Sequence, residues 1–164
     1  MAVREVLTYP HPVLKEVARE ATPEEAEATL ADLMDTMKAH DRCVGIAAPQ
    51  IGIPLRVALV DISAHPHGKD SHGLIRLVNP IVTFTSEGTK VSREGCLSLP
   101  DLTANVRRPR KATVETRGET YEVSGFEARC VLHEIDHLDG ILFLDRVASV
   151  TDDIFRRENE LRRE

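Results

Sequence analysis

Four apolar residues in the first third of the chain recur at positions i, i+3, i+4 and i+7, which places them on one face of a helix. They are Leu30, Leu33, Met34 and Met37. Just before them, Thr22, Pro23 and Glu25 are typical of an N-cap, a first helical position and a capping box. The pattern predicts a helix from Pro23 to about His40, preceded by a short helical turn over residues 13–19.

From residue 55 onward the pattern changes to runs of valine, isoleucine and leucine, which favour strands. The expected strands cover residues 55–61, 74–84, 104–107, 111–116 and 121–124. Pro80 interrupts the second of them. Between the first two lies a polar segment, residues 64–73, that contains His65, His67 and His72 and is typical of a mobile loop.

The last third of the chain predicts two further helices. One covers residues 126–138 and is closed by Gly140, which suits a C-terminal cap, and the other is a short C-terminal helix within residues 152–164. A helix, then strands, then a helix, without regular alternation, indicates an α+β fold rather than a doubly wound sheet. We therefore expect mixed or antiparallel sheets packed around a central helix at residues 126–138.

Composition narrows the class of protein. A chain of 164 residues fits one domain with an ordinary core, and a net charge of -6 argues against nucleic acid as the main partner. No stretch approaches the roughly 18 apolar residues that span a bilayer, and the N-terminus lacks the pattern of a signal peptide. The three cysteines are Cys43, Cys96 and Cys130. An odd number without an export signal favours reduced thiols, so we expect a cytoplasmic protein without membrane association.

The strongest chemical signal is an H-E-x-x-H motif on the expected central helix, formed by His133, Glu134, Ile135, Asp136 and His137. Residues i and i+4 share a helical face, so both imidazoles can bind one metal ion. Glu134 lies beside them and can transfer the proton of a water molecule. The alternative is a chance motif on a solvated helix, but the apolar flanking residues indicate a buried one. Asp136, on the opposite face, is expected to be structural.

A tetrahedral metal site needs a ligand besides these two histidines. Downstream of His137 the chain offers only Asp139 and Asp145 close by, whereas Cys96 stands upstream in an E-G-C-L-S segment. A thiolate is a strong ligand for zinc or ferrous iron. From this segment alone, a small buried hydrophobic residue is an equally good interpretation, since free cysteines are usually buried.

A third segment, residues 43–52, contains mostly small residues and one amide side chain, that of Gln50. Such a segment brings backbone groups close to a ligand and offers the amide as a directed hydrogen-bond donor. Taken singly, a tight helix-to-strand connection with an exposed Gln50 is the better interpretation.

Together and in this order, the three segments resemble the peptide deformylase motifs G-x-G-x-A-A-x-Q, E-G-C-L-S and H-E-x-D-H. The matching segments are residues 43–50, 94–98 and 133–137, and residues 7–14 are similar to the N-terminus of that family. The resemblance extends over essentially the whole chain. It implies a single catalytic domain over residues 1–164 that hydrolyses the N-formyl group from the N-terminal methionine of newly synthesised polypeptides and releases formate.

The resemblance also implies a metal site. Cys96, His133 and His137 would hold one divalent ion, Fe²⁺ in the cell with Zn²⁺ or Ni²⁺ able to replace it. Glu134 would act as the general acid and base.

Further roles follow from the same resemblance. The side-chain amide of Gln50 and the backbone N–H of Leu97 would stabilise the negatively charged oxygen of the tetrahedral intermediate. Gly45 would bind the peptide backbone, as in strand addition. The expected methionine pocket is lined by Val44, Phe126 and Cys130.

Two positions depart from the family pattern. Cys43 stands where the family usually has the first glycine of its motif, and Leu132 replaces the common glutamine before His133. Neither is an expected ligand or catalytic group. A Cβ at position 43 can change the local backbone, so we expect an altered substrate preference.

Two other functions stay open at this point. One is an amide hydrolase acting on a different N-formyl or short N-acyl substrate. The other is a non-catalytic protein with a closed structural metal site, in which Cys43 or Cys130 would supply the fourth ligand. Glu134 argues against the second, because a structural site does not need a carboxylate facing the ion.

The expected partners are N-formyl-methionyl nascent peptides, without a specific nucleic acid. Residues 152–164 mix arginines with acidic residues, so a solvated helix is favoured there and a weak ribosome contact is the second interpretation. Arg129 is expected in a structural ion pair.

Overall fold

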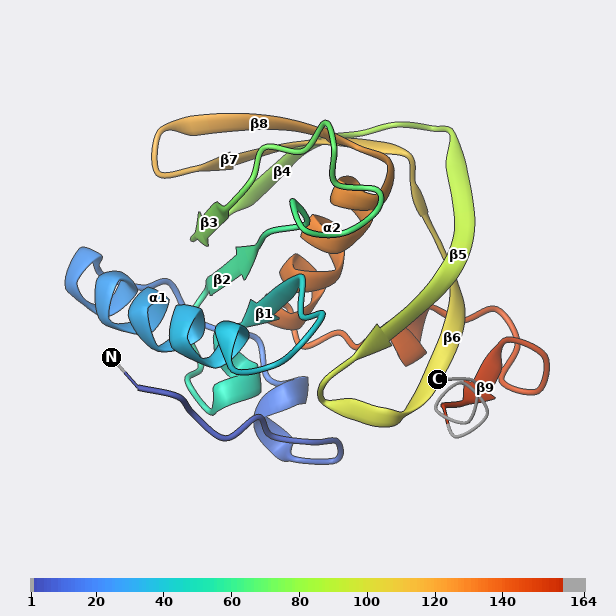
Figure 1. Cartoon of the computed structure of the whole chain (residues 1–164), viewed down its shortest axis with the longest axis horizontal. Helices are drawn as coiled ribbons and strands as arrows, with labels where there is room; N and C mark the ends of the chain where they lie inside the picture. The colour runs from blue at the N-terminus through green and yellow to red at the C-terminus, as the bar shows by residue number, and fades with distance from the viewer. Residues whose placement is uncertain (1, 158–164) are drawn as a thin grey trace.

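The computed structural model, which describes residues 2–157, has three small antiparallel sheets arranged around a helix near the C-terminus (Figure 1). The first sheet has the order β1-β2-β3, with β1 (Gly45–Ala47), β2 (Val57–Val60) and β3 (Ile75–Val78). The second has the order β4-β7-β8, with β4 (Ile81–Thr85), β7 (Lys111–Thr116) and β8 (Glu119–Ser124). The third has the order β5-β6-β9, with β5 (Thr89–Cys96), β6 (Leu99–Pro109) and β9 (Ile154–Arg156).

The helices comprise two α-helices and three short 3₁₀ turns in the described part of the chain. They are α1 (Pro23–Lys38), α2 (Gly125–Leu138), η1 (Pro12–Lys15), η2 (Ala48–Ile51) and η3 (Phe143–Arg146). Helix α2 contacts β1, β2, β6, β7 and β8, and so occupies the centre of the α+β fold expected from the sequence. No helix of residues 2–157 has the length and apolar character that crossing a membrane requires.

Helix α1 begins as the sequence predicts. The Thr22 hydroxyl accepts a hydrogen bond from the Glu25 backbone N–H at 3.2 Å, and the Glu25 carboxylate accepts one from the Thr22 N–H at 3.0 Å. Leu33 is fully buried and packs with the apolar side chains of β1 and β2. The helix ends at Lys38, close to the expected end.

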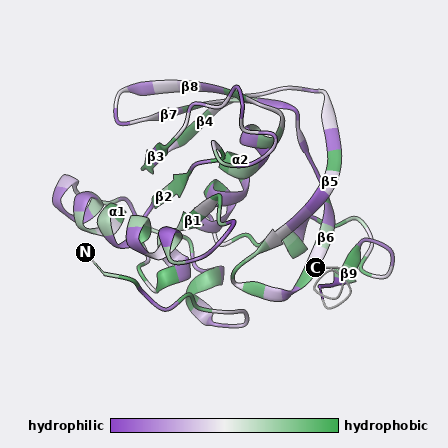
Figure 2. Cartoon of the chain, in the orientation of Figure 1, coloured by the Kyte–Doolittle hydropathy of each residue, from purple (hydrophilic) through white to green (hydrophobic). Residues whose placement is uncertain are grey.

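Helix α2 is buried along nearly its whole length, from Glu127 to Leu138. Its apolar residues pack against the first and second sheets, and Figure 2 shows how strongly hydrophobic β2 and β3 are. Gly140 has a positive φ of 73°, and the N–H of Ile141 donates to the carbonyl of Asp136 at 2.9 Å, as in a Schellman cap. The charged residues of α2 are therefore buried too, and they need partners inside the protein.

Several strand boundaries differ from the sequence prediction. The segment over residues 74–84 divides at Asn79 and Pro80 into β3 and β4, which belong to different sheets. Strand β5 is not expected from the sequence, and β6 is longer than the expected strand at residues 104–107. Strands β5 and β6 form a long antiparallel pair whose register shifts between Gly95 and Cys96.

The predicted C-terminal helix is wrong in the described part of the chain. Ile154–Arg156 forms strand β9, which pairs antiparallel with residues 102–104 of β6. The rest of the predicted helix, residues 158–164, lies outside the described residues. The helical turn expected over residues 13–19 is η1 at its start and extended after Lys15.

Candidate metal centre

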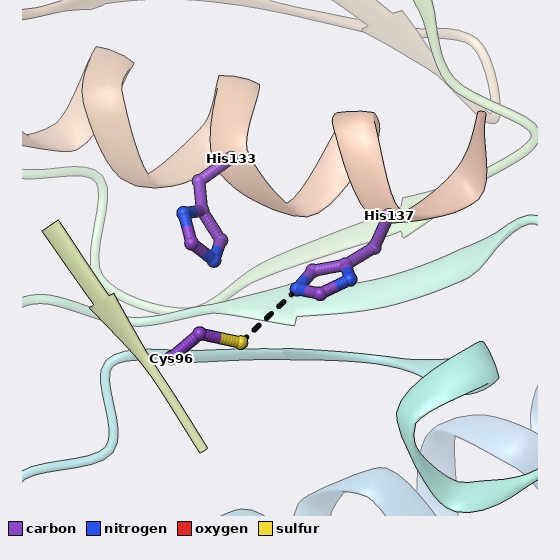
Figure 3. A group of neighbouring side chains, drawn as sticks. All are labelled: Cys96, His133 and His137. Carbon is purple, nitrogen blue, oxygen red and sulfur yellow. Dashed lines mark hydrogen bonds between the residues drawn. The ribbon is translucent and has the colours of Figure 1, made fainter. Parts of the chain in front are cut away.

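The metal-binding side chains expected from the sequence come from two elements that meet inside the protein. Cys96 ends β5 at the register shift, and His133 and His137 project from one face of α2 (Figure 3). The three possible ligand atoms all lie within 4.8 Å of one another. The Cys96 Sγ and the His137 Nε2 are 3.3 Å apart.

This donor set fits a single divalent ion. One thiol and two imidazoles are a donor set that binds zinc and ferrous iron. All three side chains are buried, with at most 9% of each residue exposed. The Nδ1 of His137 is buried without a hydrogen-bond partner among the described residues, so no hydrogen bond at that nitrogen orients the ring.

The two histidines have different surroundings. Burial would lower the pKa of His133, but hydrogen bonds with Cys96 and Glu94 raise it well above its usual range. Burial and the positive charges of His133 and Arg108 hold the pKa of His137 well below its usual range. A neutral imidazole is the form that binds a metal ion, so His133 would have to release its proton when the ion binds, whereas His137 would not.

Glu134 places a carboxylate at the same site. Its Oε1 is buried and has no hydrogen-bond partner within residues 2–157. Its Oε2 lies so close to Gly45 that a Cβ on that glycine would be 2.6 Å away. Burial raises the pKa of Glu134 to about 7, with a further contribution from the negative charge of Glu94. A carboxyl group with this pKa can both accept and donate a proton near neutrality.

Gln50 is buried, which excludes the exposed amide of the alternative interpretation. Its Oε1 accepts a hydrogen bond from the Ala47 backbone N–H at 3.0 Å. Its Nε2 donates to the Ser98 Oγ at 3.1 Å and to the Cys96 Sγ at 3.4 Å. One amide N–H is therefore directed at Cys96 of the candidate metal centre, and the other at Ser98.

A buried ionic cluster, not expected from the sequence, forms a hydrogen bond with the His133 Nδ1. Glu94 accepts hydrogen bonds from the Arg108 Nε at 2.6 Å, the Arg129 Nη1 at 2.6 Å and the His133 Nδ1 at 2.8 Å. Burial would raise the pKa of Glu94, but the hydrogen bonds from His133 and Arg108 lower it well below its usual range. Glu94 stays ionised, and it fixes the orientation of the His133 ring.

The cluster continues to Asp136 on the other face of α2. Its Oδ2 accepts from the Arg108 Nη1 at 2.9 Å, and its two oxygens accept from Arg146. The expected structural roles of Arg129 and Asp136 are thus confirmed. A sequence signal for Glu94 existed, since it opens the E-G-C-L-S segment, but nothing in the sequence indicates Arg108 as its partner.

The expected substrate-binding residues line one cavity of about 910 Å³ that opens onto this centre. They are Val44, Gly45, Phe126 and Cys130. The expected catalytic residues Gln50, Leu97 and Glu134 line the same cavity, as do Cys96 and His133, whereas His137 lies deeper. The structure thus brings the expected site residues together in one place.

Cys43 also lines this cavity, and its thiol donates a hydrogen bond to the Gly45 carbonyl at 3.2 Å. Burial and the negative charge of Glu134 raise the pKa of Cys43 to about 12. The side chain therefore stays a thiol, and it covers a carbonyl that a glycine at position 43 would leave free.

The polar loop over residues 64–73 is anchored, in contrast to the expected mobile loop. The His65 ring stacks on Phe126 with 4.3 Å between centroids, and His65 lines the cavity. The His72 backbone N–H and the His72 Nδ1 both hydrogen-bond to Glu127 in the first turn of α2, at 2.8 and 2.6 Å. The loop forms one wall of the cavity.

Residues 3–153 match the family model of polypeptide deformylases. The peptide deformylase of Bartonella tribocorum is 36% identical over 166 residues, covering 96% of this chain and 92% of that protein. That of Desulforudis audaxviator is 41% identical over 159 residues, with coverages of 92% and 97%.

Solved structures give the same result. The crystal structure of peptide deformylase from Thermotoga maritima has a TM-score of 0.79 at 31% identity, over 91% of this chain and all of that one (100%). The Met-Ala-Ser-bound class I type b peptide deformylase from Acinetobacter baumannii has a TM-score of 0.78 at 33% identity, with coverages of 89% and 100%.

Proposed function

The chain belongs to the polypeptide deformylase family and is a metal-dependent hydrolase that removes the N-formyl group from newly synthesised polypeptides, and we propose that the residues around Cys96 perform this reaction. The observation that supports these assignments is the convergence of the Cys96, His133 and His137 ligand atoms within 4.8 Å. The buried carboxylate of Glu134 lies at the same cavity.

Cys96, His133 and His137 would hold one divalent ion, which we propose to be Fe²⁺ in the cell, with Zn²⁺ or Ni²⁺ able to replace it. When bound, such an ion supplies Lewis acidity toward the formyl oxygen and toward water. Glu94 supports this arrangement, because its hydrogen bond holds the His133 ring in one orientation.

Glu134 is the general base and then the general acid. Its carboxylate accepts the proton of the water that attacks the formyl carbon, and it donates this proton to the amine that departs. The burial that raises its pKa to about 7 keeps both forms accessible.

Gln50 and Leu97 stabilise the negative charge that develops on the formyl oxygen. The Gln50 amide cannot rotate freely because the Ala47 N–H binds its Oε1, so one of its Nε2 hydrogens points toward Cys96. The backbone N–H of Leu97, next to Cys96 at the cavity wall, is the second donor. Donors fixed before the reaction cost no reorganisation during it.

The peptide lies between two open strand edges. Within residues 2–157, β1 pairs only with β2 and β5 pairs only with β6. Both strands line the cavity, β1 through Gly45 and β5 through residues 94–96. An extended peptide can hydrogen-bond to such edges as an added strand. The methionine side chain then enters the part of the cavity lined by Val44, Phe126 and Cys130. The Acinetobacter relative, solved with Met-Ala-Ser bound, supports this proposal.

Formate release from formyl-Met-Ala-Ser by protein loaded anaerobically with Fe²⁺ or Ni²⁺ tests the proposal. We expect the parent to release formate and Glu134→Gln to lose several orders of magnitude in kcat while it retains the metal. Glu122→Gln, on β8, is the matched control and should behave as the parent.

Absence of formate from fully metal-loaded parent protein would contradict the proposal. Hydrolysis of acetyl-Met-Ala-Ser in the same assay would instead support the broader amide hydrolase.

We further propose that residues 1–164 form a single catalytic domain that acts in the cytoplasm on N-formyl-methionyl nascent peptides. No membrane and no specific nucleic acid is part of this proposal, and any ribosome contact is weak. The family match over residues 3–153 supports one domain.

A further inference from the structure

The cavity wall formed by the third sheet carries arginines close to the reaction centre. Arg93 on β5 and Arg157, which follows β9, both line the cavity together with Gly95. Strand β9 brings Arg157 there by pairing with β6, and the Arg157 backbone N–H donates to the Asp101 carbonyl at 2.9 Å.

The side chain of Arg157 reaches from the end of β9 to β5. A Cβ built on Gly95 would lie 2.1 Å from the Arg157 Nη2, so the guanidinium occupies the space that a side chain at position 95 would fill. Consecutive Cα atoms are about 3.8 Å apart, so this guanidinium lies about one residue away from the metal-ligating Cys96.

The other arginines of the cavity have partners, and Arg157 differs from them. Arg93 donates to Asn105 and to Thr103 at 3.2 Å each and lies 3.6 Å above the Phe155 ring. Arg129 is bound to Glu94 in the buried cluster. In the described part of the chain, the guanidinium of Arg157 has neither a hydrogen bond nor an ion pair.

We propose that Arg157 is a specificity-determining residue that binds the carboxylate of an acidic side chain in one of the two residues after the formyl-methionine. An extended peptide advances about 3.3 Å per residue, so a chain whose formyl group is at Cys96 places these two residues along Gly95 and beyond it. The planar guanidinium binds a carboxylate through two parallel hydrogen bonds. This inference rests on the proposed function.

The test compares C-terminally amidated formyl-Met-Ala-Glu with formyl-Met-Ala-Gln, and formyl-Met-Glu-Ala with formyl-Met-Gln-Ala. A partly exposed ion pair gives up to a ~5-fold preference. In one of the two pairs, we therefore expect kcat/KM of the Glu peptide to be roughly 3–5-fold higher than that of its Gln counterpart, mainly through KM. This ratio should fall as salt rises. A peptide with a free C-terminus and no acidic side chain separates recognition of the terminal carboxylate from that of a side chain.

In Arg157→Gln the Glu-to-Gln ratio should fall to about one, and Arg157→Lys should retain part of it. Arg156→Gln is the matched control, since Arg156 is the exposed neighbour on the opposite face of β9, and it should keep the parental ratio. Equal rates for Glu and Gln peptides in the parent, or an unchanged ratio in Arg157→Gln, would overturn the inference.

Calorimetric binding of the products Met-Ala-Glu-amide and Met-Ala-Gln-amide, and of the corresponding Met-Glu-Ala and Met-Gln-Ala amides, separates this inference from the proposed reaction. Tighter binding of a Glu product by a parent that releases no formate would support Arg157 and contradict the reaction. Formate release combined with equal binding of the Glu and Gln products would overturn the role of Arg157 alone.

Discussion

At the scale of single residues, some side chains of the site pack so closely against backbone that an added Cβ would collide with them. Gly45 is the clearest case, since its missing side chain is what allows the Glu134 carboxylate to approach β1. The backbone of Gly45 and the carboxylate of Glu134 therefore share one wall of the cavity. A change at either residue acts on the other.

Gly45→Ala should displace the Glu134 carboxylate, because the new Cβ would lie 2.6 Å from its Oε2. We expect a loss of about 10²-fold in kcat, of the size that a misplacement of about 1 Å produces. Metal content should be unchanged, because the three ligands are not touched. Formate release and elemental analysis measure the two quantities, and parental kcat in this variant would show that Glu134 has room to move.

Glu94→Gln tests the ionic cluster. The variant keeps the shape of the side chain but removes a charge that compensates Arg108 and Arg129, all three being buried. We expect a loss of about 3 kcal/mol in the free energy of unfolding and a 10–100-fold weaker affinity for the metal. Urea unfolding and metal competition measure these effects.

Glu115→Gln, on an exposed position of β7, is the control for Glu94→Gln and should change neither quantity. A Glu94→Gln protein with parental stability would mean that Asp136 alone compensates the arginines.

The candidate site could be predicted in part at this scale. Spacing identifies His133, Glu134 and His137, because both ends of an H-E-x-x-H motif fall on one helical face. Cys96 and Gln50 needed the resemblance, since each has an equally good or better structural interpretation when taken singly. The partnership of Glu94 with Arg108 depends on the pairing of β5 with β6, which no local pattern reveals.

At the scale of elements, local signals worked where a segment determines its own structure. Helix α1 has a cap, a first-turn proline and an apolar stripe, and it forms as expected. Strand β5 was not predicted because charged and small residues dominate it, and it forms because β6 supplies a partner along its whole length. Residues 154–156 have a helix-like mixture of charges, but pairing with β6 makes them a strand.

The capping box of α1 makes stability depend on pH. Hydrogen bonds from Arg19 and from the Thr22 backbone lower the pKa of Glu25 from 4.5 to about 2. Between these values the unfolded chain binds more protons than the folded one, so stability rises with pH in this window. The contribution of Glu25 is complete above about pH 4.5 and is lost as the pH falls through about 2.

Thermal unfolding between pH 2 and 6 measures this contribution. Glu25→Gln should flatten the acid side of the profile, whereas Glu24→Gln, one residue earlier on the exposed first turn, should follow the parent. A Glu25→Gln profile as steep as that of the parent would assign the acid sensitivity to other carboxyl groups.

At the scale of the whole molecule, the candidate metal centre connects parts that are far apart in the sequence. Cys96 belongs to the third sheet, and His133 and His137 belong to the helix around which all three sheets are arranged (Figure 1). A bound ion therefore links the third sheet to α2. Its removal should weaken the fold as well as the reaction.

Chelation of the metal should lower Tm by about 10 °C, since a ligand at 1,000 times its Kd adds about 4 kcal/mol and each kcal/mol is worth roughly 2–4 °C in a chain of this size. Adding the ion back should restore Tm. Cys96→Ser should unfold at a temperature that chelator hardly changes. An unchanged Tm after proven metal loss would show that packing and the ionic cluster around Glu94 hold the third sheet to α2 without the ion.

All three thiols of this chain line a single cavity, so their rates of alkylation should show whether a metal ion and a peptide are bound there. Burial raises the pKa of Cys43 and of Cys130, so both should react slowly with iodoacetamide, whereas Cys96 is expected to become a reactive nucleophile once its metal is removed. The fraction of protein that gains one alkyl group during a brief reaction should therefore equal the fraction of empty metal sites. A tightly bound peptide product should suppress the slower second and third additions, so that one mass spectrum would report both metal loading and product binding.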